Sequence, residues 1–315
     1  MTIYEIAAEV GVSISTVSRV LNNPEKVSPK TKEKVEAVLK KYNYSPNAFA
    51  RGLVSNSMNS VGILITDIRN RHFSTAAYVL ENCFFNWDYS TIFCNTGDSL
   101  EKKKKYIQML SSKKVDGIVL LGSIFEGDAI KKIISEYIPD TPVVVSNGVL
   151  DMPNTYSVSI DHNYGMRLAV SHLLERGRDR ICFVYSTNTP NSKRKSYGFL
   201  NALSNKNITP VENQVFESAD PTNNFETFKN QILGLSKNFN AFIFSEDYFA
   251  LKGVNIFKEH GLDIPGDISV IGHDNSIFSL CSQPELTTID TKIDDMSTIV
   301  ANTAYSPESL SASQP

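Results

Sequence analysis

The stretch TIYEIAAEVGVSISTVSRVLN, residues 2–22, decides the fold of the first part of this chain. Thr2 followed by Glu5 predicts a capping box, in which a side-chain acceptor and a glutamate satisfy the first free amides of a helix. Apolar residues then recur at helical spacing until the chain reaches Gly11, and Ser13 begins a second helix. Two short helices joined by a glycine-containing turn predict a helix-turn-helix.

The second of these helices has a distinct outer face. Its apolar residues Val17, Val20 and Leu21 are predicted to be buried. Small side chains and one guanidinium are left facing outward: Ile14, Ser15, Thr16, Ser18 and Arg19. Small residues allow close approach to the major groove of DNA, and an arginine can donate two hydrogen bonds to one guanine.

Two further helix starts follow. Ser28 and Pro29 form a favourable N-cap and N1 pair for a third helix. Its apolar side has helical spacing and consists of Val35, Val38, Leu39 and Tyr42. Ser45 and Pro46 repeat the same start signal before one or two helical turns that end at Leu53, and a polar linker follows at residues 55–60.

Three separated motifs in this region closely resemble the lactose/galactose-repressor (LacI/GalR) family of bacterial regulators. They are residues 6–13, residues 16–22, and residues 44–48 with 50–53, and they occur in the order and spacing of that family. The resemblance implies that the second helix binds in the major groove, while the hinge helices of a dimer lie in the minor groove.

The same resemblance implies individual DNA contacts. Ile14, Ser15 and Arg19 would contact bases, and Ser13, Thr16, Ser18 and Asn22 would contact phosphates. Ala50, Arg51 and Leu53 would belong to the hinge, with Leu53 wedged between the central base pairs, an insertion that kinks DNA. By itself a leucine such as Leu53 is more often a core residue than a wedge, and its Ala-Arg-Gly-Leu context reverses this preference.

Charge is distributed unevenly over the 315 residues. The whole chain carries a formal charge of −3 from 31 Lys+Arg and 34 Asp+Glu. Residues 1–60 contain 8 of the basic and 5 of the acidic residues, a net of +3, which leaves a net of −6 for the remainder. This distribution fits DNA contact at one end of the chain only. The lysines at 102–105 are interpreted as a solvated helix face.

The composition also excludes several classes of protein. The four cysteines, Cys83, Cys94, Cys182 and Cys281, lack metal-ligand spacing and are interpreted as small core residues in a reducing compartment. The N-terminus does not have the pattern of a secretory signal, and no apolar run has the length of a membrane span. We therefore expect a cytoplasmic protein with no bound metal.

From residue 61 the pattern changes to alternating strands and helices. Strands are predicted at residues 61–66, 90–94, 117–121 and 142–146, and then at 157–160, 180–185, 215–218, 241–244 and 268–272. Helices are predicted near residues 74–86, 100–112, 164–176, 192–205, 225–237 and 248–260. Continuously apolar strands are typical of parallel sheets that helices cover on both faces.

The predicted fold is therefore an all-α helix-turn-helix headpiece with a hinge helix, followed by a two-lobed α/β effector domain. The expected boundaries are residues 1–45 for the headpiece, 46–60 for the hinge and linker, and 61–301 for the effector and dimerisation domain. Within that domain, lobe 1 comprises about 61–156 plus 290–301, and lobe 2 about 157–289. Residues 302–315 are expected to form an irregular tail.

The family resemblance continues through the body to about residue 301. Its landmarks include residues 115–118, 264–272 and 284–288. They imply a fold similar to that of periplasmic sugar-binding proteins, with a small effector between the lobes.

Ligands in such folds bind where strand C-termini face each other. The expected effector contacts are Asp67, His72, Phe73 and Asn147 from lobe 1, and Lys195, Asp247 and Asp274 from lobe 2. Phe73 could instead be a core residue, and Asp247 could be a helix N-cap.

This chain departs from the family pattern in four places. Arg71-His72-Phe73 stands where Pro-Phe-Phe is frequent, and Glu246-Asp247 stands where Asn-Asp is common. Lys195 occupies a position that is often arginine, which replaces a bidentate donor by a point charge. The family usually continues past the last crossover with a full helix and a final strand, and here the sequence becomes Ser/Pro-rich. We expect weaker folding than for a relative with that completed end.

The predicted function is a homodimeric DNA-binding transcriptional regulator, a repressor, which binds a pseudo-palindromic operator and responds to a small effector. The effector is expected to be a carbohydrate, with a nucleobase as the alternative; it could release DNA or promote binding. A transport-type solute-binding protein is the alternative function. An α/β enzyme is disfavoured because no phosphate loop, nucleophile elbow or metal cluster is evident, and no cofactor is expected.

Overall fold

The structure, a computed structural model, describes residues 2–42, 44 and 57–305. It divides into two units, Met1–Asn59 and Ser60–Pro315, each of which is described by itself. The predicted hinge helix, with Ala50, Arg51 and Leu53, lies outside the described residues.

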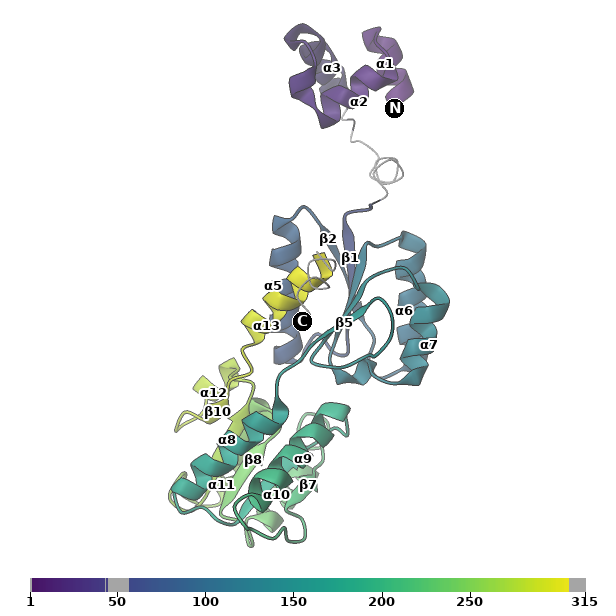
Figure 1. Ribbon diagram of the computed structural model, residues 1–315. Helices are drawn as coiled ribbons and strands as arrows, with labels where there is room; N and C mark the ends of the chain where they lie inside the picture. The colour runs from purple at the N-terminus through teal and green to yellow at the C-terminus, as the bar shows by residue number, and fades with distance from the viewer. Residues whose placement is uncertain (1, 43, 45–56, 306–315) are drawn as a thin grey trace. The chain divides into compact units, whose positions relative to one another are not determined.

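The first unit contains the predicted helix-turn-helix (Figure 1). Helix α1 (Ile3–Val10) begins with the predicted capping box: Thr2 N donates to Glu5 Oε2 at 2.7 Å, and Glu5 N donates to Thr2 Oγ1 at 3.3 Å. Gly11 ends this helix with a φ of +73°, a conformation that favours glycine. Helix α2 (Ile14–Asn22) follows at once.

The headpiece core is small. After the 3-10 turn η1 (Pro24–Lys26), helix α3 (Pro29–Lys41) starts at the predicted Ser28 cap. The buried side chains come from all three α-helices: Ile6, Ala7, Val17, Val20 and Val35. The prediction that Tyr42 belongs to the apolar side of the third helix was wrong. Its ring is exposed, and its hydroxyl donates to Glu9 Oε1, because this residue lies just beyond the end of α3.

Lobe 1 of the second unit is a five-stranded parallel sheet in the order β2-β1-β3-β4-β5. The strands are β1 (Ser60–Ile65), β2 (Ser90–Asn95), β3 (Gly117–Leu121), β4 (Val143–Ser146) and β5 (Thr155–Val158). The helices of this lobe are α5 (Arg71–Asn86), α6 (Leu100–Lys113), α7 (Asp128–Tyr137) and α13 (Ile293–Tyr305), with the 3-10 turn η2 (Ser123–Phe125). All residues of β3 and β4 are buried, as expected for strands covered on both faces.

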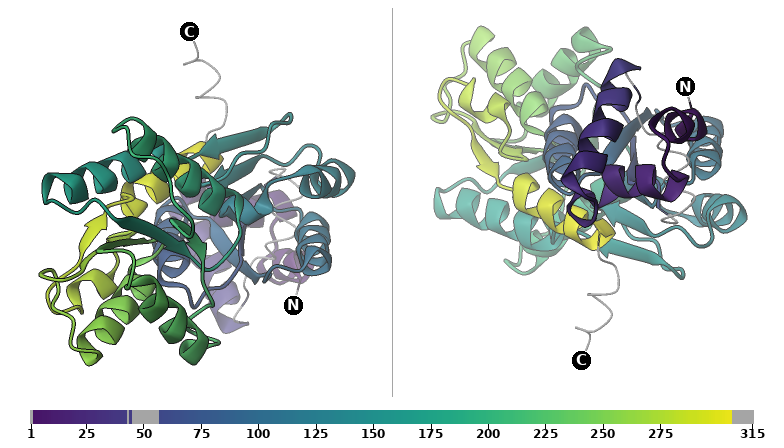
Figure 2. Two further views of the ribbon diagram at one scale, coloured as in Figure 1. Left: turned by 90° about the horizontal axis from the view of Figure 1, so that it is seen from below. Right: turned by 90° about the horizontal axis from the view of Figure 1, so that it is seen from above.

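Lobe 2 repeats this architecture with the strand order β10-β9-β8-β6-β7, again with every pair parallel. Figure 2 shows helices on both faces of this sheet. Its strands are β6 (Ile181–Tyr185), β7 (Val215–Glu217), β8 (Ala241–Phe244), β9 (Ser269–His273) and β10 (Thr287–Ile289). Its helices are α8 (His162–Glu175), α9 (Pro190–Ser204), α10 (Phe225–Leu235), α11 (Asp247–Glu259) and α12 (Ile277–Leu280).

The structure corrects the predicted division between the lobes. We placed a strand at residues 157–160 in lobe 2, but β5 ends at Val158 and pairs with β4 in the sheet of lobe 1. The last helix was also predicted to stop too early. Helix α13 continues to Tyr305 because its buried side, which includes Val300 and Ala304, packs against lobe 1. The Tyr305 ring lies 4.6 Å from that of Trp87.

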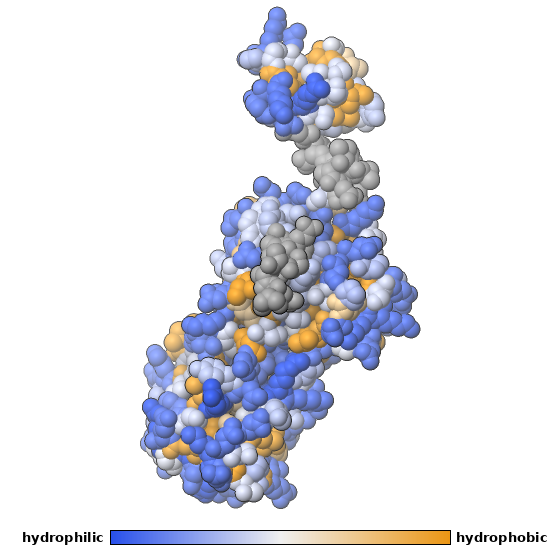
Figure 3. Space-filling model, in the orientation of Figure 1, coloured by the Kyte–Doolittle hydropathy of each residue, from blue (hydrophilic) through white to orange (hydrophobic). Residues whose placement is uncertain are grey.

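The cysteine prediction was correct in part. Cys94 and Cys182 are buried, Cys83 is half-buried, and Cys281 is exposed, because it follows the short surface helix α12. Among the described residues, none of the helices combines the length and apolar composition that a membrane span requires. The surface shown in Figure 3 is mostly hydrophilic, with apolar atoms in small separate areas.

Candidate functional site

A cavity of about 570 Å³ lies between the two lobes of the body. It forms beyond the carboxyl ends of strands in both sheets, the position at which open α/β sheets bind ligands. Its lining includes every residue that we expected to contact an effector: Asp67, His72, Phe73, Asn147, Lys195, Asp247 and Asp274.

The lobe 1 wall is built around the start of α5. Asn70 caps this helix by accepting a hydrogen bond from His72 N at 2.9 Å. Phe73 lines the cavity and also packs against the lobe 1 core, so it is both a possible effector contact and a core residue. Asp67 forms an ion pair with Arg69, whose Nη2 lies 2.7 Å from Asp67 Oδ2. Hydrogen bonds from Arg69 lower the pKa of Asp67.

Lys195 on α9 is the buried cation of the cavity. Its side chain is 8% exposed, and its ammonium donates to Ser245 O at 2.9 Å. Burial lowers the pKa of Lys195, an effect opposed by Asp274 and by the neighbouring carboxyls of Glu246 and Asp247. A cation placed among three carboxyl groups can orient a hydroxyl-bearing or anionic part of a ligand.

Gly198 explains how Lys195 reaches this position. A Cβ atom at residue 198 would lie 2.8 Å from the Cα of Asn163 on α8, so only glycine permits this approach of α9 to α8. The spacing of Lys195 and Gly198 therefore has a physical reason: the glycine sets the helix crossing, and the lysine one turn earlier is directed into the cavity.

Asp274 is the most strongly constrained acid in the site. Its carboxylate accepts a hydrogen bond from His273 Nδ1 at 2.8 Å and lies 3.6 Å from His72 Nδ1. Burial by itself would raise the pKa of Asp274, but His72, His273 and Lys195 together lower it well below its ordinary value. The residue also has a φ of +106°, a strained conformation for a residue with a side chain.

The two histidines beside Asp274 both have a lowered pKa, which favours their neutral forms. Burial and then the nearby Lys195 lower the pKa of His273 to about 4. Burial also lowers the pKa of His72, whose Nδ1 is buried without a hydrogen-bond partner among the described residues. His72 thus presents an unsatisfied polar atom to the cavity.

Asp247 lines the cavity, but it is not the helix N-cap that we considered. The N-cap of α11 is Glu246, and Asp247 is the first residue of the helix itself. The Asp247 carboxylate, 1% exposed, accepts from Thr288 Oγ1 at 2.5 Å and from Ser276 N at 2.6 Å. Gly272 must lack a side chain, because a Cβ there would overlap Asp247 Oδ1. Asp247 therefore holds two loops at the cavity floor.

Glu246 lines the cavity near Lys195, and sequence reasoning noticed it only as a departure from the family pattern. Its Oε2 accepts from Asn70 Nδ2 of lobe 1 at 3.2 Å. Burial, reinforced by Asp274, raises its pKa to about 7. Because this shift results from burial in the assembled body, no local sequence signal could have revealed it.

A stability prediction follows for Glu246. Its folded-state pKa of about 7 exceeds the ordinary 4.5, so the stability contributed by the protonated form is present below pH 4.5 and is lost as the pH rises to 7. We expect the free energy of unfolding of the wild type to fall by roughly 3 kcal/mol relative to that of Glu246→Gln between pH 4.5 and pH 8. Urea unfolding across this range measures the difference. Glu226→Gln, at an exposed site on α10, should not reproduce it.

Polar contacts between the lobes form what we call the clasp: Glu126, Asn147 and Ser123 of lobe 1 with Asn191 and Arg194 of lobe 2. Arg194 Nη1 donates to Glu126 Oε1 and Arg194 Nη2 donates to Glu126 Oε2, each at 2.8 Å. Asn191 donates to Asn147 O at 2.8 Å and to Ser123 Oγ at 3.1 Å. The cavity is thus bounded by contacts that opening of the lobes would break.

The outer face of α2 in the headpiece is the candidate DNA surface. Ile14, Ser15 and Arg19 are exposed there, and Thr16 and Ser18 are half-buried. Ser13 Oγ accepts from Thr16 N at 3.2 Å and shares hydrogen bonds with the hydroxyls of Ser15 and Thr16. The side chain of Asn22 lies outside the described part of the structure.

Comparisons with known proteins match both units. Residues 2–47 match the profile described as bacterial regulatory proteins of the lacI family, and residues 170–306 match a periplasmic binding protein-like domain. An HTH-type transcriptional regulator of Lachnoclostridium phytofermentans is 36% identical over 302 residues, covering 94% of this chain and 90% of the relative. The chain belongs to the lacI family. It is a DNA-binding transcriptional regulator.

Other transcriptional regulators are also similar to this chain in sequence or in fold. The transcriptional repressor PurR of Aliivibrio salmonicida is 31% identical over 91% of this chain and 86% of its own length. The lac repressor dimer bound to operator and the anti-inducer ONPF has the same fold, with a TM-score of 0.86 at 24% identity, covering 99% of this chain and 94% of that one. A regulator of Enterococcus faecium with bound ribose has a TM-score of 0.70 at 25% identity, covering 81% and 92%.

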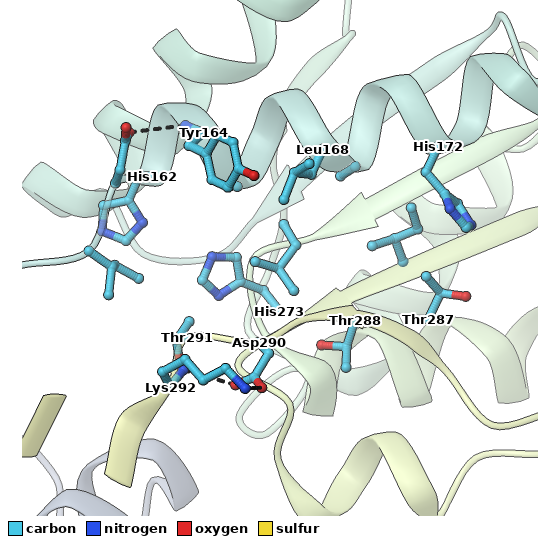
Figure 4. Close-up of a pocket in the computed structure, with 16 residues that line it drawn as sticks. His162, Tyr164, Leu168, His172, His273, Thr287, Thr288, Asp290, Thr291 and Lys292 are labelled. Carbon is cyan, nitrogen blue, oxygen red and sulfur yellow. Dashed lines mark hydrogen bonds and ion pairs between the residues drawn. The ribbon is translucent and has the colours of Figure 1, made fainter. Parts of the chain in front are cut away.

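This lacI-family member has a second cavity, of about 470 Å³, between α8 and β10 (Figure 4). Apolar side chains such as Leu168 and Ile289 form much of its lining, and Figure 4 shows His162 at one end, His172 at the other and His273 between them. His162 Nε2 also lies 3.2 Å from Asn147 Oδ1, which connects this cavity with the clasp. Sequence reasoning missed the cavity, because its lining comes from α8 and β10, which are far apart in the sequence.

Proposed function

We propose that this chain is a homodimeric transcriptional repressor whose affinity for a pseudo-palindromic operator is controlled by a carbohydrate in the inter-lobe cavity. It acts in the cytoplasm and is a regulator rather than an enzyme. The observation that carries this proposal is the combination, in one chain, of a capped helix-turn-helix with a two-lobed body whose cavity lies at opposed strand ends. Such a headpiece gives a transport-type solute-binding protein no evident role.

Carbohydrate is the supported ligand class for two reasons. The cavity combines carboxyl and amide groups with the aromatic ring of Phe73, and sugars present hydroxyl groups and apolar faces together. Two structures of similar fold at 25% identity also contain sugars, the Enterococcus faecium regulator with ribose and one from Alkaliphilus metalliredigens with D-xylulofuranose.

Control of DNA binding requires the effector to bind one arrangement of the lobes more tightly than another. Closing the lobes forms the clasp, including the two hydrogen bonds between Arg194 and Glu126. A ligand that contacts both cavity walls stabilises this closed arrangement. Strand β1 begins at Ser60, the last residue of the predicted linker, so a change in lobe 1 position alters the attachment point of the hinge.

Selection of bound sequences from a randomised DNA duplex library with the full chain tests the DNA-binding part. We expect a palindromic consensus, and Arg19→Ala should weaken binding to it by roughly 1–3 kcal/mol while relaxing preference at one position in each half-site. Lys34→Ala, which removes an exposed headpiece charge outside α2, should leave the consensus unchanged. Failure to enrich any sequence, or identical effects of the two substitutions, would contradict the proposed function.

A further inference from the structure

The acidic groups of the inter-lobe cavity are not equally satisfied. Arg69 neutralises Asp67, and His273 together with Lys195 supports Asp274. Asp247 is fully engaged by Thr288 and Ser276. Each of these acids therefore has a structural partner within lobe 1 or lobe 2.

Glu246 is different. Within the part of the chain that the structure describes, its carboxyl accepts a hydrogen bond from the neutral amide of Asn70 alone, at 3.2 Å. The nearby buried cation Lys195 donates to Ser245 O and interacts electrostatically with Asp274, Glu246 and Asp247 together. The half-buried Glu246 carboxyl thus has one neutral donor and a shared cation, and a carboxylate removed from water with so little compensation is costly.

The rest of the cavity suits a carbohydrate ring. Phe73, Tyr248, Phe249 and Phe278 contribute aromatic surface to the lining. Thr66 Oγ1 and His72 Nδ1 are buried polar atoms without a hydrogen-bond partner among the described residues, and both residues line the cavity. A ligand with several hydroxyl groups would satisfy these atoms, and a volume of about 570 Å³ accommodates one hexose with water.

We propose that the effector is an amino sugar, bound with its protonated amine at the Glu246 carboxylate. This inference rests on the proposed function and makes its ligand class specific. The ammonium group gives Glu246 a counter-charge that it does not share with other acids, in a charge-assisted hydrogen bond, while the hydroxyl groups occupy the remaining polar positions. The raised pKa of Glu246 fits this assignment, since a cationic ligand favours the ionised form.

The position of Glu246 also connects this ligand with lobe closure. Glu246 belongs to lobe 2, and its partner Asn70 caps α5 in lobe 1. A ligand ammonium group at Glu246 would therefore lie where the lobe 1 and lobe 2 walls of the cavity meet. An uncharged sugar of the same size would leave the carboxyl in its unfavourable state and would stabilise closure less.

Calorimetric titration of the full chain tests the proposal with D-glucosamine, D-galactosamine and D-mannosamine. Each is compared with its neutral parent hexose and its N-acetyl derivative, in which the amine carries no charge. We expect at least one amino sugar to bind roughly tenfold or more tightly than both of its matched compounds, a preference that corresponds to one charge-assisted contact. Glu246→Gln should remove this preference and retain affinity for the parent hexose, whereas Glu226→Gln on the exposed side of α10 should behave as wild type.

Equal binding of amino and neutral sugars, an unchanged preference in Glu246→Gln, or no binding of any amino sugar would overturn the proposal. These outcomes are distinguishable from failure of the proposed function. Release of the selected operator by a neutral sugar would overturn the amino-sugar assignment alone. Absence of sequence-specific DNA binding would overturn the repressor function, whatever the cavity binds.

Discussion

Lys195→Met is expected to lower the stability of the body by roughly 3 kcal/mol, which corresponds to a decrease of about 6–12 °C in Tm for a unit of this size. The substitution keeps the length of the side chain but removes the cation, which is 8% exposed and lies among Glu246, Asp247 and Asp274. Breaking a buried ion cluster by removing one member leaves uncompensated charge, and this accounts for the size of the effect. Urea unfolding of both proteins measures it.

The pH dependence of the Lys195→Met defect distinguishes lost charge from lost packing. Glu246 has a pKa of about 7 in the wild type, so acid neutralises part of the excess negative charge in the variant. The defect should therefore be smaller at pH 5.5 than at pH 8, whereas a packing defect would not change. Lys193→Met, two residues away on the exposed side of α9, should stay within about 0.5 kcal/mol of wild type. Equal stability of the two variants would show that the Lys195 charge has no such role.

Local signals predicted those parts of the structure that local physics determines. The capping box at Thr2 and Glu5 and the glycine turn at Gly11 act over a few residues, so the headpiece helices begin where the sequence indicated. The continuously apolar strands similarly predicted two parallel sheets. The expectation that cavity residues follow strand ends is a consequence of that topology, and it explains why the expected effector contacts line one cavity.

Features that depend on contacts distant in sequence could not be predicted in this way. Glu126 and Arg194 of the clasp are 68 residues apart, and neither belongs to a periodic pattern. The electrostatic state of Glu246 arises from burial against lobe 1. The wrong assignment of β5 to lobe 2 has a similar origin, since a short strand between two lobes can pair with either sheet and only its partner β4 decides.

Leu53→Ala is expected to reduce affinity for the selected operator by roughly 10- to 100-fold, about 1.4–2.8 kcal/mol, while leaving the body as stable as wild type. This prediction depends on the hinge motif of the sequence and on membership of the lacI family, because Leu53 lies outside the described residues. The physical reason is that an apolar side chain inserted between base pairs stabilises a bent duplex, and the bend allows both headpieces to contact their half-sites. Alanine is too short to fill the opened step.

The salt dependence of binding identifies the origin of this loss. Phosphate contacts from lysine and arginine determine how steeply affinity falls with salt, and an uncharged wedge contributes nothing to that slope. Leu53→Ala should therefore weaken operator binding by the same factor at low and high salt, with non-specific DNA binding unchanged. Leu100→Ala, at a half-exposed leucine on α6 of the body, is the matched control and should bind the operator as wild type. If Leu53→Ala weakened operator and non-specific binding by the same factor, Leu53 would serve general attachment of the headpiece and not the kink. The reason is that an uncharged side chain can favour the operator over other DNA only through a deformation that depends on the operator sequence.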